Sequence, residues 1–63
     1  MGKKEVNLFE KMIAEIESFK ENAEKLLKNG NKSAGRRSRV ATLNFEKLAK
    51  QWRKDTVKME SEM

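Results

Sequence analysis

The sequence predicts an all-α fold in which two long helices form an antiparallel hairpin. Its 63 residues include no Pro and only three Gly, so few positions would interrupt a helix. Apolar residues recur at alternating steps of three and four in both halves of the chain, which is the spacing of one face of a helix. The one clear break is Asn29-Gly30-Asn31, and a connection this short favours two neighbouring helices that run in opposite directions.

The first helix is expected at about residues 7–29, after a short, frayed basic start over residues 1–6. Asn7 is the expected N-cap, and Glu10 is placed to reach back in the manner of a capping box. Gly30 suits the left-handed residue that follows a helix. The apolar stripe that should face the core comprises Phe9, Met12, Ile16, Phe19, Ala23 and Leu26, widened by Ile13 and Leu27.

The second helix is expected at about residues 32–60, with Asn31 or Ser33 as its N-cap. Its apolar stripe comprises Ala34, Ser38, Ala41, Phe45, Leu48, Trp52, then Asp55 or Thr56, and Met59. The small residues come first, next to the turn, where the two helices must approach closely. Because Phe45 and Trp52 lie on this stripe, we interpret them as packing residues rather than as platforms for base stacking.

We treat residues 1–63 as a single helical-hairpin domain. A hairpin of this size buries too little apolar surface to be comfortably stable, and the chain has no Cys with which to form a disulfide. We therefore expect the hairpin to self-associate into a homodimer or a higher homo-oligomer. The simplest such assembly is a dimer that forms a four-helix bundle.

The composition argues against catalysis. The chain has neither His nor Cys, which removes the usual acid–base group and the common metal ligands. The carboxylates show no paired arrangement, and no phosphate-cradling glycine motif is present. We expect no enzyme activity, no metal, no cofactor and no small-molecule substrate.

Nothing in the sequence indicates a membrane protein. No apolar run approaches the roughly 20 residues that span a bilayer. The start, MGKKEVNLFEKM, has no continuous apolar stretch of the signal-peptide type. We expect a cytosolic protein present at its full length.

Positive charge is concentrated in the second half of the chain. Residues 1–30 hold six Lys and six Glu, whereas residues 31–63 hold nine Lys or Arg and four acidic residues. Seven of these cations share one face of a helix that turns by about 100° per residue. This basic row comprises Lys32, Arg36, Arg39, Lys47, Lys50, Lys54 and Lys58. A face of this kind is typical of binding to a polyanion, and nucleic acid is the expected one.

The segment GNKSAGRRSR, residues 30–39, adds local features that favour phosphate binding. It joins a turn to the start of a helix, where exposed N–H groups attract phosphate oxygens, and it adds bidentate Arg side chains. Ser33 and Ser38 are candidate hydroxyl donors. Gly35 would permit close approach either of the partner helix or of a nucleic-acid backbone.

Two arginines flank the apolar stripe. Arg37 and Arg53 are expected to lie along the core and to pair with Glu residues of the first helix rather than with phosphate. Arg37 is nevertheless kept among the candidate DNA contacts because it lies within the basic entry to the helix. The complete candidate set is Lys32, Arg36, Arg37, Arg39, Lys47, Lys50, Lys54 and Lys58.

Three apolar residues, Val40, Leu43 and Val57, are expected to face outward among the cations. They would cover part of a subunit contact, or contact DNA sugars or thymine methyl groups, or be ordinary scattered surface residues. The sequence leaves these three readings open.

The run from Gly30 to Lys58 resembles the bacterial linker-histone-like proteins of the chlamydial type. That family shows a Gly-Asn-Lys-x-Ala turn, an Arg-x-Arg entry, a Leu-x-x-Glu-Lys-x-x-Lys segment and an Arg-Lys-x-(Ser/Thr)-x-Lys segment. The matching positions are Gly30, Asn31, Lys32, Ala34, Arg37, Arg39, Leu43, Glu46, Lys47, Lys50, Arg53, Lys54, Thr56 and Lys58. The first helix agrees with the family only in character.

The resemblance implies a histone-like, nucleoid-associated protein that condenses or bridges double-stranded DNA with little sequence preference. Members of the family continue into a long Lys-rich tail thought to bind DNA, which this sequence does not show. We therefore expect either that the helical face binds DNA itself or that the hairpin is mainly a dimerisation module.

Two other functions use the same residues. One is a helical oligomerisation or adaptor module that binds an acidic protein. The other is association with RNA or the ribosome through the basic row, since phosphate contacts distinguish RNA from DNA poorly.

Overall fold

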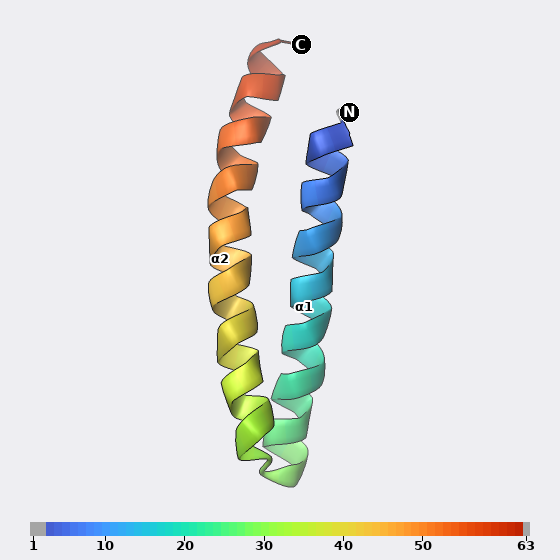
Figure 1. The fold of residues 1–63 in the computed structure, drawn as a ribbon, viewed down its shortest axis with the longest axis vertical. Helices are drawn as coiled ribbons and strands as arrows, with labels where there is room; N and C mark the ends of the chain where they lie inside the picture. Colours follow the sequence, from blue (N-terminus) through green and yellow to red (C-terminus); the bar gives the residue numbers. More distant parts are fainter. Residues whose placement is uncertain (1–2, 63) are drawn as a thin grey trace.

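The protein is an antiparallel hairpin of two helices, as the sequence predicts. The computed structural model describes residues 3–62, in which helix α1 spans Lys3–Asn29 and helix α2 spans Lys32–Ser61. No strand is present among these residues, which confirms the all-α fold. The hairpin measures 48 × 15 × 12 Å, and the end of α2 projects beyond the start of α1 (Figure 1).

Helix α1 begins earlier than expected. It starts at Lys3, so Asn7 is an exposed residue inside the helix and the prediction that it caps the helix is wrong. Residues 3–6 are helical rather than frayed, and the remainder of the predicted frayed start lies outside the described residues. No Gly or Pro between Lys3 and Asn7 breaks the helix, and Glu5 lies in the first turn, where a negative charge is favourable.

The turn is built by local signals that the sequence displays. Gly30 adopts a φ of 66°, and its N–H donates to the Leu26 carbonyl at 2.9 Å, which closes the last turn of α1. Asn31 then caps α2, because its side-chain Oδ1 accepts from the Ala34 N–H at 3.0 Å. Of the two predicted caps, Asn31 is therefore the one used, and Ser33 is an exposed residue of the first turn.

The helices are packed most closely beside the turn. Here α2 presents only small buried residues, namely Ala34, Gly35, Ser38 and Ala41. A Cβ added at Gly35 would lie 3.2 Å from both Leu26 methyl carbons, so the absence of a side chain lets α1 approach. This observation supports the packing explanation for Gly35. The ribbons diverge from this point toward the open end (Figure 1).

Larger side chains fill the space toward the open end. Leu8 of α1 is buried, and Leu48 of α2 is half-buried. The Phe9 and Trp52 rings lie with their centroids 6.4 Å apart at a tilt of 44°, a favourable aromatic arrangement. Trp52 and Phe45 are both half-buried, in agreement with their expected packing role.

The predicted core stripe of α1 is displaced to one side of the helix. The residues of α1 that are buried against α2 are Leu8 and Asn22, neither of which belongs to the predicted stripe. Four large members of that stripe are instead 37 to 49% exposed, namely Phe9, Ile13, Ile16 and Phe19, and Leu27, which was expected to widen the stripe, is 82% exposed. The remaining members, Met12, Ala23 and Leu26, are half-buried. The stripe is wider than a single partner helix can cover, so one edge of it remains open to solvent.

This open edge forms a continuous surface with α2. Ile16 and Phe19 line one shallow depression together with Thr42 and Phe45, and Phe9 contacts Trp52 farther along. We call this surface the apolar face and define it as Phe9, Ile13, Ile16 and Phe19 of α1 with Phe45 and Trp52 of α2. The opposite side of the hairpin carries Ser18, Arg37 and Asn44, and we call it the polar side.

Candidate nucleic-acid interface

The basic row lies on the outer side of α2. Each of its seven side chains is exposed, whereas Ala34 and Ala41 on the opposite side of the same helix are buried against α1. At 1.5 Å per residue, the row extends for about 39 Å between Lys32 and Lys58. A single helix therefore holds all seven cations on one side, because no break interrupts α2 between Lys32 and Ser61.

Few of these cations are neutralised within the chain. Lys50 lies 3.9 Å from the Glu46 carboxylate, and both side chains are more than 60% exposed, so this is a weak surface ion pair. Over residues 3–62, the other six members of the row form no ion pair. Their charges are thus available to an external anion.

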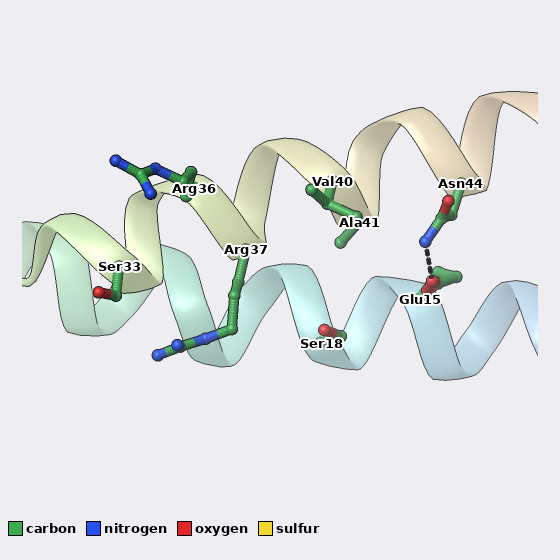
Figure 2. A pocket seen from close by; sticks show the side chains of 8 residues that line it. All are labelled: Glu15, Ser18, Ser33, Arg36, Arg37, Val40, Ala41 and Asn44. Atoms are coloured by element: carbon green, nitrogen blue, oxygen red, sulfur yellow. Dashed lines mark hydrogen bonds between the residues drawn. The ribbon is translucent and has the colours of Figure 1, made fainter.

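Arg37 differs from the basic row. Its Nε–H donates to Asn22 Oδ1 at 2.9 Å, and the Asn22 amide in turn donates to the Ser18 carbonyl at 2.8 Å. The Arg37 side chain therefore runs across the hairpin onto α1, while Arg36 points away from α1 (Figure 2). The prediction that the Arg37 side chain lies along the core is confirmed. Its expected pairing with a Glu of the first helix is wrong, because the residue of α1 that accepts its hydrogen bond is Asn22.

A shallow groove of about 430 Å³ runs between the helices on the polar side of the hairpin. Arg36, Arg37 and Ser33 line one end of it, and the other end holds a hydrogen bond of 2.9 Å between Asn44 Nδ2 and Glu15 Oε1 (Figure 2). The groove is thus cationic near the turn and acidic farther along. Such a mixed and open surface is poorly suited to enclosing a small molecule.

The start of α2 offers fewer donors than the sequence suggests. The N–H groups of Ala34 and Gly35 are already bonded to Asn31. Ser38 is buried, and its hydroxyl donates to the Gly35 carbonyl at 2.6 Å, so the prediction that it contacts phosphate is wrong. Ser33 remains exposed beside Arg36.

The polar cross-links between the helices were missed by sequence reasoning. The Arg37–Asn22 and Asn44–Glu15 hydrogen bonds both join α2 to α1 on the polar side of the hairpin. Polar residues placed at seam positions, above all Asn22 between Ser18 and Leu26, are the signal that would have indicated them. Asp55 is a further seam residue, with Oδ1 accepting from Gln51 Nε2 at 2.7 Å and Oδ2 buried without a donor.

The described residues show neither a metal-binding cluster nor a membrane-spanning helix. Among residues 3–62, no group of three or more acidic, His or Cys side chains is arranged to hold a metal ion. Neither α1 nor α2 is long and apolar enough to cross a membrane. The exposed cations are thus the main chemical feature of the part of the chain that the structure describes.

Comparison with known proteins identifies a histone-like family. A family model described as histone H1-like protein Hc1 matches residues 6–62. The match extends over both helices and the turn. No curated protein and no solved structure matches the chain.

Proposed function

The chain belongs to the family of histone H1-like protein Hc1, and from this premise we propose that it is a nucleoid-associated protein that binds double-stranded DNA. The observation that carries the proposal is the basic row: seven exposed cations on one side of α2, of which one forms an ion pair. Because the family is one of DNA-packaging proteins, catalysis has no part in the proposal. The proposed location is the cytoplasmic nucleoid.

The proposed mechanism is electrostatic. Lys and Arg side chains of the row contact backbone phosphates and release condensed counterions, which favours binding without reading the bases. A straight helix follows the curved backbone of a duplex for only part of its length. Three or four members of the row would therefore contact one duplex at a time.

We further propose that two hairpins dimerise through the apolar face into a four-helix bundle. The support is the exposure of four large apolar side chains of α1 on one side of the hairpin, since burying them stabilises a dimer by about 25 cal/mol per Å². The basic row lies on the outer side of α2 and stays exposed in such a bundle. Each dimer would present two rows, and rows that engage different duplexes would bridge and compact DNA.

Neutralising the centre of the row tests the proposal. The variant Arg36→Gln, Arg39→Gln, Lys47→Gln, Lys50→Gln should lose most of its affinity for random-sequence duplex DNA while its circular dichroism remains helical. The matched control removes four charges from α1, by Lys3→Gln, Lys4→Gln, Lys20→Gln and Lys28→Gln. Equal loss of binding in the two variants would show that net charge, and not the row, determines affinity.

A competition arm separates DNA from RNA. Structured RNA that displaces duplex DNA at equal nucleotide concentration would favour the RNA-associated alternative for the same row. Failure of RNA to compete supports the nucleoid assignment. Absence of a shift with either nucleic acid at moderate salt would instead favour an adaptor that binds an acidic protein.

A further inference from the structure

Leu43 occupies the centre of the basic row. Cations stand four residues from it on either side, then seven residues, then eleven residues. These three pairs are Arg39 with Lys47, Arg36 with Lys50, and Lys32 with Lys54. Leu43 is itself 57% exposed, and Val40, one turn before it, is 53% exposed. The most outward position of α2 is therefore apolar and is bracketed symmetrically by positive charge.

We propose that α2 crosses the major groove of DNA with Leu43 at the point of closest approach, where Leu43 and Val40 contact the methyl groups of thymine. This inference rests on the proposed function and deepens it, because it adds an apolar contact inside the groove to the contacts with phosphate. It assigns a ligand to two residues that the hairpin itself leaves exposed.

The spacing of the cations fits a groove flanked by two backbones. At 1.5 Å per residue, Arg39 and Lys47 are about 12 Å apart along the helix, and Arg36 and Lys50 are about 21 Å apart. The major groove is about 12 Å wide, whereas the minor groove is about 6 Å wide and too narrow for a helix of about 10 Å diameter. The inner pair can therefore reach the phosphates that border a major groove while Leu43 lies between them.

The charges around Leu43 identify the occupant of this surface. When the flanking cations engage phosphates on both sides, the only DNA surface opposite Leu43 is the floor of the groove. Thymine presents its C5 methyl group there, and a leucine side chain is a suitable apolar partner. A second copy of the chain is a poor alternative, because two basic rows packed against each other would bring like charges together.

Removal of the thymine methyl group tests the contact without changing the protein. We compare affinity for two short alternating duplexes of equal length, one of A·T pairs and one in which every thymine is replaced by uracil. Burying one methyl group contributes about as much to affinity as burying one CH₂ group. The protein should therefore bind the uracil duplex about three- to fourfold more weakly for each thymine methyl group that it buries. In a G·C duplex, 5-methylcytosine places a methyl at the same position and should raise affinity similarly.

Protein variants assign the effect to Leu43. Leu43→Ala should reduce the difference between thymine and uracil duplexes, and Leu43→Ala combined with Val40→Ala should abolish it, while the dependence of affinity on salt is unchanged. The matched control is Leu27→Ala, which truncates an exposed leucine of α1 and should retain the full difference.

The outcomes separate this inference from the proposed function. Equal affinity of the wild-type protein for the two duplexes, with steep salt dependence, would overturn the groove contact and leave phosphate binding intact. A thymine preference that is undiminished in the variant lacking both the Leu43 and the Val40 side chains would also overturn it. Absence of binding to either duplex would overturn both the groove contact and the proposed function.

Discussion

Gly35 shows how one missing side chain determines the approach of the two helices. A Cβ at this position would lie 3.2 Å from two carbons of Leu26, so a larger residue requires the Leu26 side chain to shift. We expect Gly35→Val to destabilise the hairpin by about 1–3 kcal/mol through overpacking, despite the poor intrinsic helix propensity of Gly. Thermal unfolding followed by circular dichroism would measure the change.

A double mutant identifies the cause of that effect. In a Leu26→Ala background, Gly35→Val should cost much less stability, because the clashing methyl groups are gone. An equal cost in the two backgrounds would mean that the close contact with Leu26 is not the reason for glycine at this position.

Arg36 and Arg37 are neighbours in the sequence with different expected roles. Arg37→Ala leaves the buried Asn22 Oδ1 without its donor and should destabilise the fold by about 1–2 kcal/mol. Arg36→Ala removes an exposed cation that points away from α1 and should mainly weaken DNA binding (Figure 2). Unfolding curves and DNA titrations on both variants distinguish the roles, and the assignment fails if the two variants behave alike.

At the scale of the helices, the apolar face is the main unexplained surface of the hairpin taken alone. We expect Ile16→Glu to shift the protein from dimer to monomer in a sedimentation measurement, because it places a charge in the centre of the proposed interface. Ala14→Glu adds the same charge at an exposed position on the polar side of α1 and should leave the assembly unchanged. A wild-type chain that sediments as a monomer at high concentration would contradict the proposed bundle.

The helices themselves were largely predictable because their boundaries at the turn depend on local chemistry. Gly30 is the residue type best able to adopt a positive φ, and Asn31 is a strong N-cap, so both could be assigned without tertiary information. The start of α1 was not predictable in the same way. Asn7 has the right chemistry for a cap, but nothing before it stops the helix from extending back to Lys3.

The rotation of α1 about its own axis was the harder problem. A stripe with the breadth of Phe9, Ile13 and Ile16 specifies a side of the helix but does not say which edge meets α2. Packing beside the turn decides this, because Gly35 admits Leu26 and Arg37 reaches Asn22. For the candidate site, the exposure of the basic row could be predicted from the helical spacing of its residues alone. The hydrogen bond that Arg37 makes to Asn22 could not, because it depends on the rotation of α1 about its axis.

At the scale of the whole molecule, the hairpin separates two kinds of surface. The apolar face lies to one side of the seam between the helices, and the basic row lies on the outer side of α2, away from α1. One helix thus contributes Phe45 and Trp52 to packing and its outer side to the proposed DNA contact. Under the proposed function, one surface mediates dimerisation while the other binds DNA, which is the physical basis of the proposed compaction.

The dependence of DNA affinity on salt tests this account most directly. Titration of the wild-type protein with random-sequence duplex DNA at several salt concentrations gives the slope of log affinity against log salt. If a dimer contacts roughly four to eight phosphates through its basic rows, the slope should have a magnitude of about 3–7. A flat response to salt would contradict the electrostatic mechanism on which the account depends.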